Sequence, residues 1–155
     1  MSGVPATLTI PIPATEGPLR RIFAEVSFGI PSKATAVASA VEMVRRTMEM
    51  VGVKDDWVSR TELCLQEALL NAHFHGNRSD ARREIHVRCT LSAAKVELYV
   101  EDEGSGYDWD GNVSSVDITK STGRGLFLIR QLMDSVTITG NHIAMSLSKE
   151  SNYGN

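Results

Sequence analysis

The chain has 155 residues, a length typical of one domain, and 42% of them are apolar, which is enough to build a two-layer core. Its net charge of -3 and pI near 5.8 provide no basic field, so we expect no direct nucleic-acid partner. No apolar run approaches the length of a membrane span, and the start lacks the pattern of a signal peptide, so we expect a cytoplasmic protein without a membrane partner.

The two ends of the chain differ in composition from the rest. Prolines interrupt residues 1–20 around the short apolar stretch Leu8-Thr9-Ile10, which allows one edge strand in an otherwise irregular arm. Residues 150–155 are polar. We therefore expect a Pro-rich arm over residues 1–20, one folded domain over 21–149 and a polar tail over 150–155.

Apolar spacing predicts one strand and two helices in the first half. Residues 22–30 alternate roughly, and Pro31-Ser32 is expected to end this strand and cap a helix. Apolar residues then recur at helical spacing up to Gly52, a natural helix stop. A second helix is predicted over residues 56–74, capped by Asp55 or Asp56, with Ser59 and Glu62 as an alternative capping box.

The second half predicts two hairpins separated by a loop and a helix. Residues 84–91 and 95–101 alternate cleanly, residues 107–122 form a long polar loop that we interpret as a lid, and a helix spans residues 125–133. Strands over 135–139 and 142–148 meet at a tight turn. This order predicts an α+β fold, a two-layer α/β sandwich with a mixed, mostly antiparallel sheet and helices on one face.

Neither cysteine has the pattern of a disulfide partner. Cys64 lies on the apolar face of the second predicted helix, and Cys89 lies on the apolar face of a predicted strand. Both are expected to be buried thiols, which favours a reducing compartment.

Glu67, Asn71 and His75 recur at i, i+4 spacing and form one polar stripe on the second predicted helix. Taken alone, such a stripe is most often a solvated helix face. The chemical alternative is that the carboxylate takes a proton from a hydroxyl nucleophile and the amide oxygen ligates Mg²⁺. His73 and His75 are too few for a zinc site, and His73 is predicted to lie on the surface.

Two glycine-rich patches follow. Asp102 ends a predicted strand, and Gly104 and Gly106 would let the chain turn sharply beside a flat ligand, with the carboxylate accepting from an exocyclic amine such as that of adenine. An acidic turn is the ordinary alternative. The second patch is the run Gly123-Arg124-Gly125-Leu126, which opens a helix whose N–H groups could hold phosphates. It matches neither the dinucleotide fingerprint nor the P-loop pattern.

The order of these patches carries a resemblance. Residues 66–72 (QEALLNA) with His75-Gly76, residues 101–106 (EDEGSG), and residues 123–126 (GRGL) with Met133-Asp134 resemble the three sequence boxes of the GHKL, or Bergerat-fold, histidine-kinase-like ATPases. Within that superfamily the chain is most similar to the single-domain anti-sigma-factor serine/threonine kinases. The match spans residues 22–148.

The resemblance implies roles for individual residues. Glu67 would be the general base, Asn71 the Mg²⁺ ligand and Asp102 the adenine contact. Gly104, Gly106, Gly123 and Gly125 would shape an ATP pocket, residues 107–122 would form its lid, and His75, Arg124 and Leu126 occupy other motif positions around the nucleotide.

The resemblance also implies partners. It points to a bacterial, cytoplasmic, homodimeric protein kinase that phosphorylates a STAS-domain anti-anti-sigma factor and sequesters a sigma factor by partner switching. Two alternatives stay open: a nucleotide-binding switch without transfer, and a kinase that regulates a different signalling partner.

Overall fold

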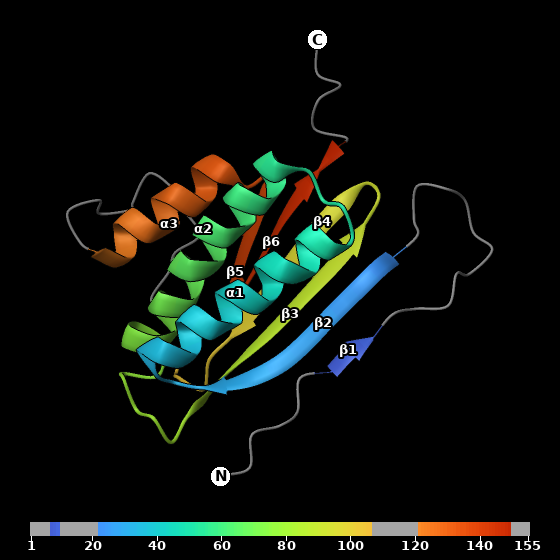
Figure 1. Cartoon of the computed structure of the whole chain (residues 1–155). Helices are drawn as coiled ribbons and strands as arrows, with labels where there is room; N and C mark the ends of the chain where they lie inside the picture. Colours follow the sequence, from blue (N-terminus) through green and yellow to red (C-terminus); the bar gives the residue numbers. More distant parts are fainter. Residues whose placement is uncertain (1–6, 10–21, 107–120, 150–155) are drawn as a thin grey trace.

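The computed structural model describes residues 7–9, 22–106 and 121–149. Three α-helices cover one face of a six-stranded sheet, which gives a two-layer α+β fold (Figure 1). In chain order the elements are β1 (Thr7–Thr9), β2 (Ile22–Pro31), α1 (Ala34–Met50), α2 (Asp55–Asn71), the π-helix η1 (Ala72–Gly76), β3 (Glu84–Ser92), β4 (Lys95–Glu101), α3 (Ser121–Leu132), β5 (Ser135–Thr139) and β6 (His142–Ser148).

The strand order is β1-β2-β3-β4-β6-β5, and all the described pairings are antiparallel. The predicted fold class is therefore confirmed, with a sheet that is antiparallel throughout its described strands. The hairpins β3–β4 and β5–β6 form where alternation predicted them, and Gly140 has the positive φ of +57° that the tight turn requires.

The core lies between the sheet and the helices. Alternate residues of β3 and β4 point toward the helices and are buried, as are the apolar positions of α1 that recur at helical spacing. Cys64 and Cys89 are free, buried thiols, as predicted. Burial disfavours the thiolate and raises the pKa of each to about 12.

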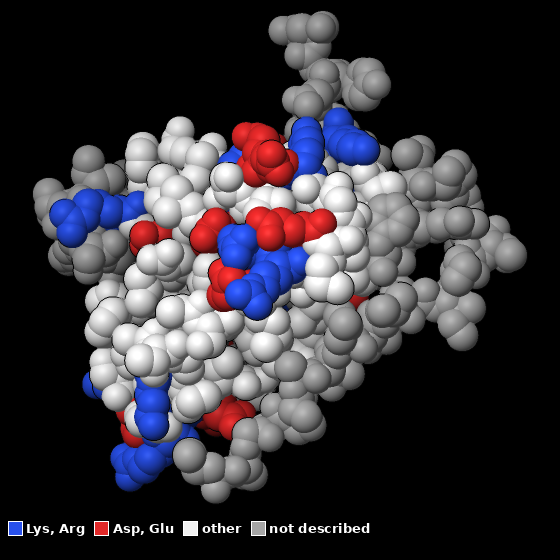
Figure 2. All heavy atoms as spheres, viewed as in Figure 1, with Lys and Arg blue, Asp and Glu red and all other residues white. Residues whose placement is uncertain are grey.

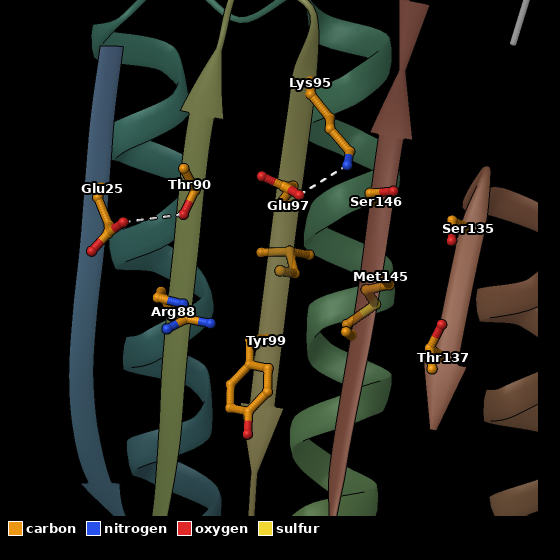
Figure 3. Close-up of a pocket in the computed structure, with 12 residues that line it drawn as sticks. Glu25, Arg88, Thr90, Lys95, Glu97, Tyr99, Ser135, Thr137, Met145 and Ser146 are labelled. Atoms are coloured by element: carbon orange, nitrogen blue, oxygen red, sulfur yellow. Dashed lines mark hydrogen bonds and ion pairs between the residues drawn. The ribbon is translucent and has the colours of Figure 1, made fainter. Parts of the chain in front are cut away.

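The opposite face of the sheet carries polar side chains over a shallow groove of about 440 Å³ (Figure 3). The guanidinium of Arg88 lies over the ring of Tyr99, 5.0 Å from its centroid, and the Tyr99 hydroxyl donates to Glu101 at 2.7 Å. Lys95 pairs with Glu97 at 2.9 Å. These side chains are polar or charged and interact with one another. This face of the sheet is therefore suited to contact with water, as one face of an antiparallel sheet commonly is.

The outward face of α1 carries a compact group of charges, visible near the centre of Figure 2. Arg45 pairs with Glu42 and with Glu49, each at 2.6 Å, and Arg46 pairs with Glu42. Water and salt screen such surface pairs, so each contributes little to stability. None of the helices in the described part of the chain is both long and apolar enough to span a bilayer.

Helix starts depart from the predictions. The N-cap of α1 is Lys33, and the Ser32 hydroxyl does not cap the helix but meets His73. Helix α2 is capped by Lys54 without a side-chain bond, so neither predicted aspartate cap nor the capping box forms. Helix α3 begins at Ser121 rather than at the predicted Gly125, so Gly123 and Gly125 both lie within its first turns.

Candidate functional site

Helix α2 supplies the first pair of candidate residues. Glu67 and Asn71 lie one turn apart, and Asn71 is the last residue of the α-helical segment. Asn71 is only 5% exposed, yet its amide nitrogen has no hydrogen-bond partner among the described residues. Buried polar groups are almost always paired, so an unpaired buried amide indicates a position prepared for a ligand.

Helix α3 brings the third patch against this pair. A Cβ placed on Gly125 would lie 2.7 Å from Oε2 of Glu67 and 3.4 Å from the amide nitrogen of Asn71. The missing side chain at Gly125 therefore leaves room for the Glu67 carboxylate beside α3, while Asn71 lies at an ordinary contact distance. At the far end of α3, Arg60 of α2 donates to the Leu132 carbonyl at 2.8 Å and so ties the two helices together.

The π-helix η1 links the polar stripe of α2 to the strand-end patch. Its wider turn is closed by the bond from the Asn77 N–H to the Ala72 carbonyl at 2.7 Å. Gly76 ends this turn directly against Asp102, because a Cβ on Gly76 would overlap the Asp102 carboxylate. Wide helical turns of this kind are frequent at functional sites.

Asp102 is a buried carboxylate at the end of β4. It is 2% exposed, and its Oδ1 accepts a hydrogen bond from the Gly104 N–H at 2.8 Å. Burial raises the pKa of Asp102, and the hydrogen bond from Gly104 opposes that shift. The carboxylate retains acceptor capacity for an incoming N–H donor.

Gly104 and Gly106 are required by their surroundings. A Cβ on Gly104 would overlap the Gly76 carbonyl. Gly106 has φ of +99°, and a Cβ there would lie 3.1 Å from the backbone of Gly140. Side chains at either position would push the strand-end segment away from η1 or from the β5–β6 turn, so both glycines shape this segment.

The remaining predicted positions differ in their surroundings. Leu126 is buried in the core, Gly123 is partly exposed in the first turn of α3, and Arg124 is exposed. His75 is exposed on η1, and no described contact ties it to Glu67 or Asp102. The predicted lid over residues 107–122 falls outside the described residues except for its last two positions, which begin α3.

His73 corrects a prediction, since it is buried rather than on the surface. It is 6% exposed, its Nδ1 lies 2.8 Å from the Ser32 hydroxyl, and its ring packs beside Phe74 at 4.6 Å between centroids. The contact joins the start of α1 to η1. The prediction of a surface position provided no partner for the imidazole, whereas the fold supplies one in Ser32.

Two asparagines that bind the main chain around Asp102 were not among the predicted site residues. Asn77 is fully buried and accepts from the Glu103 N–H at 2.8 Å. Asn141 donates from its side chain to the Asp102 carbonyl at 2.5 Å, and its own carbonyl accepts from the Asp102 N–H at 3.0 Å. The available signals were the position of Asn77 directly after His75-Gly76 and the Gly140-Asn141 turn.

A cleft of about 390 Å³ opens beside the strand-end segment. It is lined by Gly76, Arg78, Arg83, Glu103, Gly104 and Ser105. Arg78 and Ser79 both have positive φ, at 52° and 58°, directly after η1. Non-glycine residues rarely adopt this conformation, so the segment is sharply bent around the cleft.

These groups fit a magnesium nucleotide. The side-chain oxygen of Asn71 is the type of ligand that Mg²⁺ takes, its unpaired amide nitrogen is a donor suited to a phosphate oxygen, and Asp102 is an acceptor suited to an amine. Among the described residues no three His, Cys, Asp or Glu side chains form a metal cluster. Magnesium commonly binds in this way, with few protein ligands, the rest coming from phosphates and water.

The chain is similar in sequence to several known proteins. The chain matches the histidine kinase-like ATPase domain over residues 30–147. It is 27% identical over 132 residues to the serine-protein kinase RsbW of Bacillus subtilis, covering 77% of this chain and 82% of that protein. The RsbW proteins of Bacillus velezensis and Staphylococcus epidermidis are 28% and 26% identical, covering 72% and 66% of this chain and 78% and 74% of those proteins. The family match spans both helices of the site and the two strands between them, so this chain belongs to the family of histidine kinase-like ATPase domains.

Proposed function

We propose that the protein is a Mg-ATP-dependent serine/threonine-protein kinase. The observation that carries the proposal is the close approach of α3 at Gly125 to Glu67 and Asn71, which gathers a carboxylate, an amide with an unpaired nitrogen and the first turns of a helix. The name shared by the RsbW relatives supports serine as the phosphorylated residue.

The nucleotide would lie along the line from Asp102 to Glu67. Asp102 would accept from the exocyclic amine of adenine, with Gly104 and Gly106 beside the base. Gly123, Arg124 and Gly125 would face the phosphates, with Leu126 anchoring α3 in the core and His75 nearby on η1. Asn71 would ligate Mg²⁺, which neutralises phosphate charge when bound.

Glu67 would accept the proton of the attacking hydroxyl. Phosphoryl transfer depends mainly on positioning and charge stabilisation, so one base and one metal ligand are sufficient protein groups. Apolar side chains are exposed close to Glu67 in the chain or on the facing helix: Leu63 is 40% exposed and Phe127 is 44% exposed. Such side chains suit contact with a protein acceptor better than with a small polar molecule.

The biological role follows from the family resemblance. We propose that the acceptor is a STAS-domain anti-anti-sigma factor, and that the kinase also sequesters a sigma factor as a homodimer in the bacterial cytoplasm. Phosphorylation of the acceptor would then decide which partner the kinase holds. This proposal extends the kinase activity to the control of transcription through protein partners, without a nucleic-acid contact of its own.

The test is transfer of labelled phosphate from ATP to a STAS-domain acceptor. Glu67→Gln should bind Mg-ATP as the unmodified protein does, and should lose transfer by a factor of roughly 10² to 10⁴, the usual value of general base catalysis. Glu62→Gln, on the same helix, is the matched control and should keep full transfer. Unchanged transfer by Glu67→Gln would remove Glu67 from the mechanism.

A further inference from the structure

Asn77 is a fully buried asparagine whose side chain is bonded at both ends. It is 0% exposed, and it lies directly after η1. Its Oδ1 accepts from the Glu103 N–H at 2.8 Å, and its Nδ2 donates to the Glu84 carbonyl at 2.9 Å. The amide therefore joins the end of η1 to the start of β3 and to the segment after β4.

The main chain of Asn77 is fixed as well. Its N–H donates to the Ala72 carbonyl at 2.7 Å, which closes the π-turn, and its carbonyl accepts from the Asp80 N–H at 3.1 Å. With four bonds and no exposed surface, Asn77 has little freedom to move. Whatever its side chain holds is therefore held in place relative to α2, because η1 continues α2 directly.

The peptide that Asn77 holds is the one next to Asp102. Glu103 follows Asp102 in the chain, and Gly76, which precedes Asn77, lies against the Asp102 carboxylate. Asn141 binds the Asp102 main chain from the other side, through its carbonyl and its side chain. Asp102 is thus held between two asparagines, and the Asn77 side chain bonds its segment to η1, which continues the helix that carries Glu67 and Asn71.

We propose that Asn77 is a positioning residue for base recognition, which fixes the Asp102 carboxylate at the distance from Asn71 that lets one nucleotide reach both. The inference rests on the proposed adenine contact of Asp102. It adds that selectivity for the 6-amino group depends on a buried residue that never touches the nucleotide.

The test compares two nucleotides, ATP and purine riboside 5′-triphosphate, which lacks the 6-amino group. Dissociation constants for both are measured by calorimetry with Mg²⁺. The unmodified protein should prefer ATP, and Asp102→Ala should abolish the preference. Asn77→Ala should lower the ratio of the two affinities by roughly tenfold, mainly by weakening the binding of ATP. A tenfold change is about the value of one hydrogen bond to a charged group, here the bond from the 6-amino group to Asp102.

A matched control separates positioning from loss of stability. Val87→Ala truncates a buried side chain of β3 and should destabilise the fold while leaving the affinity ratio unchanged. If Asn77→Ala keeps the full ratio while Asp102→Ala loses it, the inference is wrong and the adenine contact stands. If the unmodified protein itself shows no preference for ATP, the proposed adenine contact of Asp102 is wrong, and the role of Asn77 that rests on it is wrong as well.

Two further measurements keep the inference testable should Asn77→Ala not fold. Asn77→Ser is a smaller change whose short hydroxyl cannot span both partners, and it should also lower the ratio. In the unmodified protein the Glu103 N–H should exchange slowly with deuterium although the Glu103 residue is exposed. Fast exchange of that N–H would show that the bond to Asn77 is not maintained, and would overturn the proposal.

Discussion

The surroundings of Asp102 disfavour the ionised form of its carboxyl group. Burial raises its pKa above the ordinary value of 3.8, because the charged form loses more hydration than the neutral one. Between 3.8 and the folded pKa, the folded chain binds this proton more tightly than the unfolded chain does. The contribution of Asp102 to the free energy of unfolding therefore falls as pH rises through that window.

A donor placed on the Asp102 carboxylate would reverse that shift. The 6-amino group of adenine favours the ionised form, so ATP should lower the pKa of Asp102, and ATP affinity should weaken as pH falls toward the folded pKa. Carbon NMR of the Asp102 carboxyl, titrated with and without ATP, measures the shift. Purine riboside 5′-triphosphate is the control, and an equal shift with both nucleotides would contradict the assigned contact.

The burial of individual residues was predictable from the sequence in some places and not in others. Alternation predicted the buried residues of β3 and β4, because strand faces depend only on neighbouring positions. The burial of His73 was not predictable in that way. His73 is paired with Ser32, 41 positions away in the chain, and no local pattern relates the two residues.

At the level of elements, the site depends on the contact between α2 and α3. The sequence indicated that Glu67, Asn71 and Gly125 belong to one pocket only through resemblance, since no local pattern relates residues on separate helices. The structure gives the contact a physical cause. Gly125 leaves room beside α3 for the Glu67 carboxylate, and Arg60 joins the other end of α3 to α2 through the Leu132 carbonyl.

Gly125→Ala should therefore separate stability from activity. The added methyl group would meet the flexible end of Glu67 at 2.7 Å, which can move, and alanine favours the helix, so the free energy of unfolding should change by less than about 1 kcal/mol. Phosphate transfer should fall by about 10²-fold because the carboxylate is displaced. Urea unfolding and the transfer assay measure the two effects.

The matched control is Gln131→Ala, at an exposed position of the same helix. It should leave both stability and transfer nearly unchanged, within about 0.5 kcal/mol for stability. Normal transfer by Gly125→Ala would mean that Glu67 tolerates displacement, and that the contact between the helices does not set its position.

Helix boundaries were the least predictable feature of the elements. Ser32 has a side chain of the type that caps helices, but its hydroxyl is hydrogen-bonded to His73. Helix α3 begins four residues before the predicted start at Gly125. Capping preferences describe an isolated helix end, whereas tertiary partners compete for the same side chain. The fold class was predictable because it depends on many strand and helix patterns that agree.

For the whole molecule, the nucleotide should act as a stabilising ligand. Mg-ATP at 100 times its dissociation constant should raise the free energy of unfolding by about 2.7 kcal/mol. Asn71→Ala should lose most of the Mg²⁺-dependent part of this gain, while costing little in the free protein, because its amide nitrogen has no partner among the described residues. Urea unfolding with ATP, in Mg²⁺ or in EDTA, measures both effects.

Gln66→Ala, an exposed position on α2, is the control and should respond to Mg-ATP as the unmodified protein does. A gain from ATP that is the same in Mg²⁺ and in EDTA, for the unmodified protein, would contradict the assignment of Asn71 as a metal ligand. A loss of Mg²⁺ dependence confined to Asn71→Ala would support it.

The pairing of β2 with β3 has a consequence for the speed of folding. Pro31 pairs with Glu84, so this strand pair encloses α1, α2 and η1, whereas β3–β4 and β5–β6 are local hairpins. Closing a long loop costs chain entropy before any contact repays it, and non-local pairing slows folding. We therefore expect the hairpins and the α1–α2 pair to form early and the β2–β3 ladder to set the rate. Helix α2 of the site lies inside that loop, and Asp102 follows β4. We therefore expect the site to be assembled in this slow step.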